Sequence, residues 1–357
     1  MSFLDRIKPS VRGLETYAVR GKALEAGLIK LNQNENPFDV PAELKRELVE
    51  ELFHKPWNRY PGVFPDELID TLAQAVGHPR EGIIAGNGSN ELMYTILMSV
   101  VTRGTKVLIP VPSFFLYEKA VRVFDGDVVA VPMNKDLSFP TMEIIRRAKE
   151  EDPSLIILVS PNSPTGQSIA LDDVARILAE TGSLVLVDEA YIEFSDKPSA
   201  QRLLASNDRL IVLRTFSKAF SMAGLRIGYL LAAPSLCAEI LKPKIPFTVN
   251  AFSASVAMKL LHYRPLIDER IAAIKGERNA LLAALRSTPG VETFASDTNF
   301  LIFKTPHPAH AVFDRMLGRN VLIRDVSSYP MLERTLRVNA GTKEENRNFL
   351  SALREIL

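Results

Sequence analysis

The sequence predicts an α/β fold, with a mostly parallel central sheet flanked by helices and a smaller α+β domain at the C-terminal end. Three short apolar segments, at 155–159, 184–187 and 210–213, are typical of buried strands, and each is followed by polar residues. Key polar positions that follow these strands are spaced by 26 and 30 residues, which is the length of a βαβ repeat. After residue 287, helical segments alternate with short strand-like ones, as in an α+β domain.

The other elements follow from apolar periodicity and from the glycine, proline and asparagine residues between them. An N-terminal arm has a weak helical pattern at 19–26, and a loop rich in asparagine and proline follows at 31–41. The segment 265–286 has apolar residues close to a 3.6-residue period, so we expect one long helix that links the two domains. The other helices are expected at 41–53, 91–101, from 112 onward, 141–150, 234–241, 251–262, 309–317 and 343–357. The other strands are expected at 83–85, 106–109, 128–131, 228–232, 299–304, 321–324 and 335–338.

Composition argues against several classes of function. The chain has 357 residues, of which 46% are hydrophobic, so it can build a large core and a second, smaller one. Its 43 basic and 42 acidic residues give a net charge of +1, which offers no general field for nucleic acid or an anionic membrane. We find no secretory signal and no apolar run near the ~18 residues of a membrane span. The single cysteine, Cys237, fits a buried hydrophobic position in a reducing compartment, so we expect a cytoplasmic protein.

The stretch 209–228 carries the strongest chemical signal. Lys218 follows a buried strand, where lost solvation can keep an amine partly neutral and able to form an imine. Thr215, Ser217 and Arg226 lie close by in sequence and supply the donors and positive charge that suit a phosphate. Taken alone the signal is weak, because a lysine at a strand end is more often a solvated surface residue.

Two further strand ends strengthen this interpretation. Asn162 and Ser163 follow the first of the three strands, and Asp188 and Tyr191 follow the second. The carboxyl ends of parallel strands meet along one edge of a sheet, where ligands bind, so these side chains could converge on Lys218. An imine-forming lysine, a carboxylate, ring-oxygen donors and a phosphate cup are together what pyridoxal 5′-phosphate requires.

A glycine-rich turn offers a second place for the phosphate. The residues GNGSN at 86–90 precede an expected helix, and exposed N–H groups at a helix start attract anions. Ser89 could instead cap that helix, and both roles are compatible because the cap geometry creates the anion site.

The segments SPNSPTG, VDEAY and TFSKAFSMAGLRIGY together resemble the fold-type I pyridoxal-phosphate aminotransferases, and most closely the histidinol-phosphate aminotransferases. The resemblance extends from LNQNENP at residue 31 to LRVNAGTKEEN at residue 336. It implies an N-terminal arm and active-site loop at 1–40, a large cofactor-binding domain at 41–286, and a small domain at 287–357 that packs with the arm. It also implies a homodimer that acts on small-molecule substrates.

The resemblance assigns roles around the cofactor. Lys218 would bond to it and later move a proton, Asp188 would keep the pyridine nitrogen protonated, and Tyr191 would tune the ring oxygen. Phe114 stands where the family has an aromatic ring stacked on the pyridine, with an ordinary core phenylalanine as the alternative. The phosphate would be held by Ser89, Asn90, Thr215, Ser217 and Arg226.

Two positions depart from the family pattern. Asn90 stands where the family usually has aspartate, a change of little cost if backbone groups bind the phosphate. Ser163 stands where the family usually has an asparagine that donates to the ring oxygen. The donor could therefore be Ser163, Asn162 or Tyr191 alone.

The resemblance also points to residues for the substrate and for the partner subunit. Tyr17, Asn36, Arg324 and Arg337 are the expected substrate contacts, and Tyr60 would reach the cofactor phosphate of the other subunit. The alternatives are structural: an arm tyrosine anchored on the core for Tyr17, salt bridges for the arginines, and packing on Trp57 for Tyr60.

The two arginines with Tyr17 favour L-histidinol phosphate as amino donor and 2-oxoglutarate as acceptor. An aromatic amino-acid aminotransferase would share nearly every motif, because one arginine can serve a carboxylate. A threonine-phosphate decarboxylase is a third possibility. A ligand-sensing module fused to a DNA-binding domain is disfavoured, because there is no basic patch. A degenerate binding protein is disfavoured, because the set Asp188, Tyr191, Lys218 and Arg226 is complete.

Overall fold

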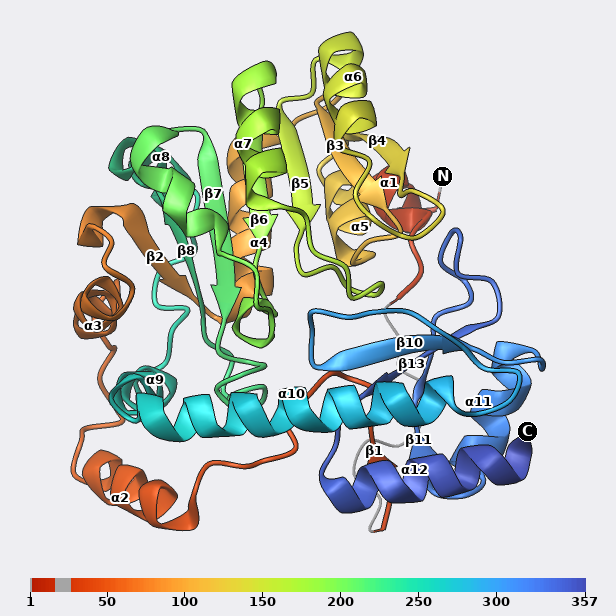
Figure 1. Cartoon of the computed structure of the whole chain (residues 1–357). Helices are drawn as coiled ribbons and strands as arrows, with labels where there is room; N and C mark the ends of the chain where they lie inside the picture. Colours follow the sequence, from red (N-terminus) through yellow and green to blue (C-terminus); the bar gives the residue numbers. More distant parts are fainter. Residues whose placement is uncertain (1, 17–26) are drawn as a thin grey trace.

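A seven-stranded sheet forms the centre of the larger of two bodies in the computed structural model, which describes residues 2–16 and 27–357 (Figure 1). The strand order is β2-β8-β7-β6-β5-β3-β4. Strand β8 runs antiparallel to both of its neighbours, whereas the other pairs are parallel. This confirms the predicted mostly parallel sheet. The strands are β2 Ile83–Gly86, β3 Lys106–Val111, β4 Asp127–Pro132, β5 Leu155–Val159, β6 Leu184–Asp188, β7 Leu210–Thr215 and β8 Gly228–Ala232.

Helices cover both faces of this sheet because its central strands are apolar on both sides. In β5, Ile156 and Leu158 pack into one apolar cluster, and the alternate residues Leu155, Ile157 and Val159 pack into another. The cluster that contains Ile156 includes residues of α3, α6, α7 and α9, whereas the other includes residues of α4, α5 and α8. The helices are α3 Asp66–Val76, α4 Gly88–Val100, α5 Leu116–Val123, α6 Thr141–Glu151, α7 Leu171–Glu180, α8 Pro234–Leu241 and α9 Ala251–His262. Cys237 of α8 is free and buried, as expected for a packed hydrophobic residue.

The smaller body is built on a four-stranded antiparallel sheet of order β12-β13-β10-β9. Its strands are β9 Glu292–Thr293, β10 Phe300–Lys304, β12 Arg324–Asp325 and β13 Thr335–Asn339, and its helices are α11 Ala309–Leu317 and α12 Lys343–Ile356. A two-stranded parallel pair joins β1 Ile29–Lys30 to β11 Val321–Leu322. This pairing fixes the segment just before the cavity-lining residues 32–35 to the smaller body.

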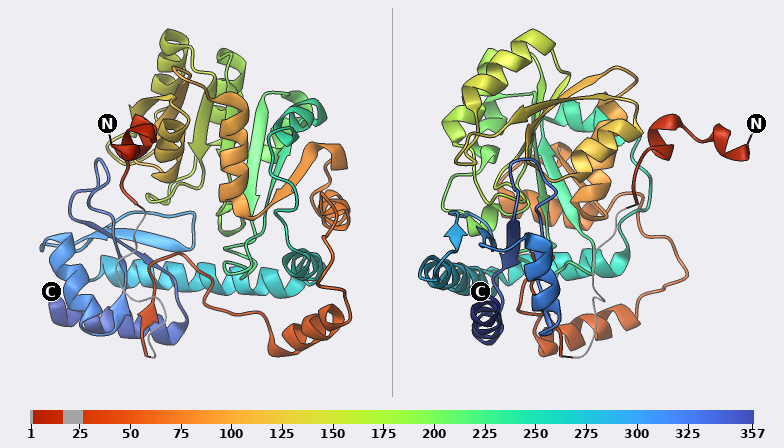
Figure 2. Two further views of the ribbon diagram at one scale, coloured as in Figure 1. Left: turned by 180° about the vertical axis from the view of Figure 1, so that it is seen from behind. Right: turned by 90° about the vertical axis from the view of Figure 1, so that its right-hand side faces the viewer.

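The predicted long helix is observed as α10 (Arg264–Arg286), which runs beneath both bodies (Figure 1). Helix α2 (Ala42–Phe53) lies near the N-terminal end of α10, below α9 and away from the smaller body (Figure 1). The N-terminal segment, with η1 (Phe3–Arg6) and α1 (Pro9–Arg12), stands out to one side of the larger body (Figure 2). In the described ranges no helix combines the length and the apolar character that crossing a bilayer requires.

Several predicted boundaries were wrong. Helix α4 begins at Gly88 rather than at residue 91, because the glycine-rich turn is its first turn. The expected strand 321–324 is split at Ile323, because Val321–Leu322 pairs with β1 and Arg324–Asp325 pairs with β13. Helix α3 and the two-residue strands β1 and β9 were not predicted. The predicted pattern at 19–26 lies outside the described residues.

Candidate active site

A cavity of about 390 Å³ lies at the carboxyl ends of β5, β6 and β7, and residues of both bodies line it. Most of the residues singled out from the sequence meet here: Ser89, Asn90, Phe114, Ser163, Asp188, Tyr191, Thr215, Ser217, Lys218, Arg226, Arg324 and Arg337. A second group lines the same cavity but carried no predicted role: Asn32, Gln33, Asn34, Glu35, Phe115 and Tyr329. The topology of the sheet therefore produces the convergence that the strand spacings predict.

Lys218 lies in the turn that follows β7. Its Nζ donates a hydrogen bond to the backbone oxygen of Gln33, at 2.9 Å. The same Nζ lies 5.7 Å from the centroid of the Tyr191 ring. The amine thus stands inside the cavity, in contact with the loop that precedes α2.

Asp188 ends β6 and is only 7% exposed. Its Oδ2 accepts a hydrogen bond from the Tyr117 hydroxyl at 2.7 Å, and its Oδ1 accepts one from the backbone N–H of Ala190 at 3.0 Å. Burial raises the pKa of Asp188 to about 6, although both hydrogen bonds act in the opposite direction. The carboxyl group is therefore charged at neutral pH and close to its titration range.

Tyr117 of α5 is a site residue that the sequence did not indicate. It is buried, and burial together with the neighbouring Asp188 raises its pKa well above the usual value. The phenol therefore stays protonated and acts as a donor to Asp188. Its sequence position, on the buried face of a helix, carries no signal that distinguishes it from an ordinary core tyrosine.

A cup of hydrogen-bond donors occupies one end of the cavity. Thr215 Oγ1 donates to Ser217 Oγ at 3.0 Å, and Arg226 Nη1 also donates to Ser217 Oγ at 3.0 Å. Ser89 and Asn90, in the first turn of α4, line the same cavity. Among the described residues no carboxylate lies within 4 Å of the Arg226 guanidinium, so its charge faces the cavity uncompensated by an ion pair.

Two close approaches hold this cup together. Gly88 has φ +78°, and a Cβ there would lie 2.5 Å from Arg226 Nη2. A Cβ at Gly228 would lie 2.4 Å from the backbone nitrogen of Ser89. Only glycine lets β8 and Arg226 approach the start of α4 this closely. The N-cap of α4 is Asn87 and not Ser89, so the capping alternative for Ser89 is wrong.

The candidates for the ring-oxygen donor differ in position. Tyr191 and Ser163 both line the cavity, and Ser163 Oγ accepts a hydrogen bond from Arg337 Nη1 at 3.3 Å. Asn162 is buried, but its side-chain amide donates to the backbone oxygen of Pro112 at 3.3 Å and does not line the cavity. The Ser160–Pro161 and Ser163–Pro164 peptide bonds are both cis in this turn.

Arg324 and Arg337 are direct register partners on β12 and β13, and both line the cavity. Arg337 Nη2 donates to the backbone oxygen of Asn32 at 2.9 Å, and its guanidinium lies 5.2 Å from the centroid of the Phe300 ring. In the described part of the chain no carboxylate lies within 4 Å of the Arg324 guanidinium, so the salt-bridge alternative for this residue is not observed. The two arginines place two positive charges on the wall of the smaller body.

The remaining predicted residues lie elsewhere. Tyr60 is 84% exposed and packs on Phe247, with ring centroids 4.9 Å apart. Trp57 is 81% exposed, and no ring contact between it and Tyr60 is found. Asn36 donates from its side chain to the backbone oxygen of Ala219 at 3.0 Å and lines an adjoining hollow instead. Tyr17 lies outside the described residues.

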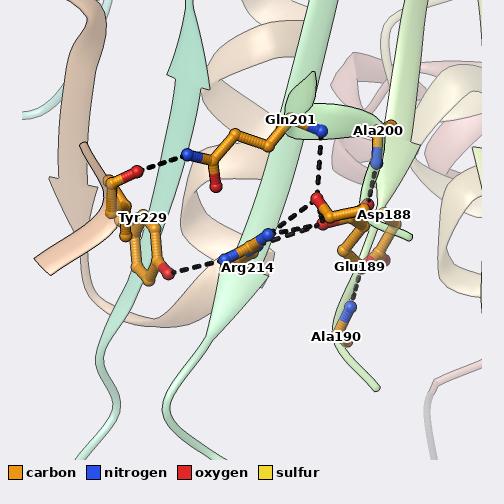
Figure 3. A network of polar contacts seen from close by, with 9 residues as sticks. Asp188, Glu189, Ala190, Ala200, Gln201, Arg214 and Tyr229 are labelled. Carbon is orange, nitrogen blue, oxygen red and sulfur yellow. Dashed lines mark hydrogen bonds and ion pairs between the residues drawn. The ribbon is translucent and has the colours of Figure 1, made fainter. Parts of the chain in front are cut away.

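Behind the cavity, a buried ion pair joins the strands that carry the site (Figure 3). Glu189 follows Asp188 directly, and its Oε2 accepts from Nε and Nη2 of Arg214, each at 3.0 Å. Ser199 Oγ and the backbone N–H of Ala200 also donate to this carboxylate, each at 2.7 Å. Successive residues of a strand point to opposite faces, so this network fixes β6 and β7 from the face opposite Asp188 and Thr215.

Comparison with known proteins agrees with this geometry. Residues 26–353 match the family model "Aminotransferase class I and II", and the chain belongs to this family.

More specific relatives are histidinol-phosphate aminotransferases. The chain is 44% identical to that of Chlorobium limicola over 352 residues, which cover 99% of this chain and 98% of the relative. It is 46% identical to that of Chlorobium chlorochromatii over 350 residues, covering 98% and 96% of the two chains. Among solved structures, the histidinol-phosphate aminotransferase of Sinorhizobium meliloti in complex with pyridoxal-5′-phosphate has the same fold, with a TM-score of 0.88 at 23% identity and coverage of 98% and 97%.

Proposed function

We propose that the enzyme transfers the amino group of L-histidinol phosphate to 2-oxoglutarate, giving imidazole acetol phosphate and L-glutamate in histidine biosynthesis, with pyridoxal 5′-phosphate as cofactor. The observation that carries the substrate assignment is the Arg324–Arg337 register pair on the cavity wall. Two guanidinium groups suit a phosphate ester, because each offers paired donors and a permanent charge. Relatives that are 43–46% identical over nearly the whole chain are named histidinol-phosphate aminotransferases.

The donor set of the cavity fits the cofactor. Its phosphate would be held by Arg226, Ser217 and Thr215 together with the first turn of α4, where Gly88 leaves room for Arg226 to approach. Phe114 offers a flat apolar face to the pyridine ring. When bound, the cofactor supplies an aldehyde that bonds to amines and a ring that accepts electrons from the substrate carbon.

The protein's own residues then have separate tasks. Lys218 would hold the cofactor before the substrate arrives, and its amine, once freed, would move a proton at the substrate carbon. The Asp188 carboxylate keeps a proton on the ring nitrogen, while Tyr117 and the Ala190 N–H hold that carboxylate in place. The Tyr191 hydroxyl would donate to the ring oxygen, with Ser163 as a second candidate donor. Arg324 and Arg337 bind the substrate anion, and Tyr17 and Asn36 remain proposed substrate contacts.

We also propose that the enzyme is a cytoplasmic homodimer. Tyr60, Val63 and Phe247 are exposed large hydrophobic residues. Tyr60 packs on Phe247, whose backbone N–H donates to the Val63 oxygen at 3.4 Å. An exposed cluster of this kind is typical of an interface, and a partner subunit would allow Tyr60 to reach the neighbouring cofactor phosphate. Sedimentation of the purified protein at micromolar concentration should give twice the chain mass, and a monomer at that concentration would contradict this part of the proposal.

The substrate is tested by a single half-reaction. The cofactor-loaded enzyme is mixed with L-histidinol phosphate in the absence of any keto acid, and the cofactor's absorption is followed. Conversion to the pyridoxamine form should be much faster than with phenylalanine at the same concentration. Faster conversion with phenylalanine would make this an aromatic amino-acid aminotransferase.

A threonine-phosphate decarboxylase activity is the alternative, and it is supported by similarity to one solved structure. The L-threonine-O-3-phosphate decarboxylase of Porphyromonas gingivalis has a TM-score of 0.81 at 25% identity, with coverage of 92% of this chain and 98% of that one. Both substrates are phosphate esters of amines, so the arginine pair alone does not separate them. Release of carbon dioxide from threonine phosphate, with no conversion of histidinol phosphate, would select the decarboxylase.

A further inference from the structure

The hydroxyl of Tyr191 has one partner among the described residues, and that partner is Asn34. The side-chain Nδ2 of Asn34 donates to Tyr191 Oη at 2.9 Å. Both side chains are buried, with Asn34 2% and Tyr191 6% exposed, and both line the cavity. An amide N–H can only donate, so the phenol oxygen accepts here and its single hydrogen must point elsewhere.

We propose that Asn34 is a positioning residue that turns the O–H of Tyr191 into the cavity, so that it donates to the ring oxygen of the bound cofactor. The inference rests on the proposed role of Tyr191 and adds a residue that acts through it. Without Asn34, the phenol would be free to rotate or to use its hydrogen on another acceptor. With Asn34 in place, the hydrogen is directed before the cofactor arrives, which lowers the cost of ordering the site.

The surroundings of Asn34 explain how it can hold this orientation. Its backbone N–H donates to Asn339 Oδ1 at 3.1 Å, and its backbone oxygen accepts from Asn299 Nδ2 at 3.1 Å. Asn299 precedes β10 and Asn339 ends β13, so both contacts come from the smaller body. The Tyr191 ring also lies edge-on to Phe300, with centroids 5.3 Å apart. The smaller body thus fixes both the ring and the amide that sets the direction of its hydroxyl.

The backbone at this position limits the choice of test variants. Asn34 has φ +56°, a left-handed conformation that glycine, asparagine and aspartate adopt more easily than other residues. Asn34→Gly removes the amide without backbone strain. Asn34→Asp keeps the shape, but an ionised carboxylate can only accept and would take the Tyr191 hydrogen away from the cavity.

The readout is the pH midpoint at which the absorption of the bound cofactor changes. A donor to the ring oxygen stabilises its negative charge and so lowers this midpoint. Tyr191→Phe should raise the midpoint, and Asn34→Gly and Asn34→Asp should each raise it by about half to one pH unit. The affinity of the cofactor-free protein for pyridoxal 5′-phosphate should fall about three- to tenfold in the same variants.

The double variant Asn34→Gly/Tyr191→Phe separates positioning from a merely structural role. Its midpoint should equal that of Tyr191→Phe alone, because Asn34 then has no hydroxyl to direct. Ser221→Gly is the matched control, because Ser221 also has a left-handed φ of +58° and its hydroxyl donates to the backbone oxygen of Phe38 in the same loop 31–41, at 2.7 Å. It should leave the midpoint unchanged.

Each outcome has a distinct meaning. If Tyr191→Phe moves the midpoint but both Asn34 variants leave it unchanged, the positioning role is wrong and the proposed function stands. Additive shifts in the double variant would also overturn it, because they would mean that Asn34 acts independently. If Tyr191→Phe itself leaves the midpoint unchanged, the proposed role of Tyr191 fails and the inference falls with it.

Discussion

The strand ends of the large sheet and residues 32–35 of the segment 31–36 both line the cavity, but they contribute in different ways. The strand ends supply reactive side chains: Asp188 after β6 and Lys218 after β7. The segment 31–36 supplies mainly backbone oxygens, of which Gln33 accepts from Lys218 and Asn32 accepts from Arg337. Side chains of particular chemical types can be recognised in a sequence, whereas backbone carbonyl groups are present at every residue. The side chains of the first region were therefore predicted individually. For the second region the resemblance implied only an active-site loop, and its backbone contacts became visible only in the folded chain.

This comparison also suggests a division of labour that can be tested. Changes at the strand ends should alter the chemical step, and changes on the wall of the smaller body should alter substrate affinity. Changes on the opposite face of the same strands should alter stability alone.

The largest effect is expected from Lys218→Ala. Without the amine there is neither a group that holds the cofactor covalently nor a base at the substrate carbon, so kcat should fall by at least about 10⁴-fold. Circular dichroism should show an unchanged fold, because within residues 2–16 and 27–357 the Lys218 amine makes a single hydrogen bond, to Gln33. Substantial turnover by this variant would remove Lys218 from the catalytic role.

The next effect concerns the buried pair on the opposite strand face. Arg214→Met leaves the Glu189 carboxylate, 2% exposed, without its cation, and should lower the free energy of unfolding by about 3–5 kcal/mol. Urea unfolding measures this. Lys149→Ala breaks the exposed pair with Glu180 and should cost no more than about 1 kcal/mol. Equal losses in the two variants would mean that the buried network does not fix β6 and β7.

Arg337→Gln tests the wall of the smaller body. Loss of a charged donor to the substrate anion should raise KM for histidinol phosphate about 10- to 100-fold, with a smaller change in kcat. The control is Arg319→Gln in the same body, where the arginine pairs with Glu355 on the surface and lines none of the cavity. A loss confined to kcat in Arg337→Gln would contradict the proposed division of labour.

The smallest effect is a pH dependence of cofactor binding. Burial raises the pKa of Asp188 to about 6, so the carboxylate that partners the ring nitrogen becomes protonated as the pH falls through 6. Affinity of the cofactor-free protein for pyridoxal 5′-phosphate should then fall by up to about tenfold per pH unit below that value.

Asp188→Asn serves as the reference for this titration. The second ionisation of the phosphate also lies near pH 6, but it is common to both proteins, so only the difference between the two profiles reports on Asp188. Parallel profiles would show that Asp188 does not titrate in this range.

The sequence predicted the large sheet well because its central strands are buried on both faces and are therefore continuous apolar runs. Helix α3 was missed although Asp66 and Glu67 follow Pro65 at its start, a signal that was available in the sequence. Strands β1 and β9 have two residues each, too few for a periodic pattern. The predicted domain boundary at residue 287 stays a prediction.

The sequence by itself determined which chemical groups follow the strands, and the βαβ spacing required those strand ends to meet. Only the tertiary structure decided which partners these groups have. Tyr117 reaches Asp188 across 71 positions and Asn34 reaches Tyr191 across 157. Tyr117 belongs to no motif, and Asn34 lies in the segment LNQNENP but carried no predicted role. Such contacts depend on how helix α5 packs on the sheet and how the smaller body holds the segment 31–36. Both are set by the summed packing of many apolar side chains, and no local pattern in the sequence encodes that sum.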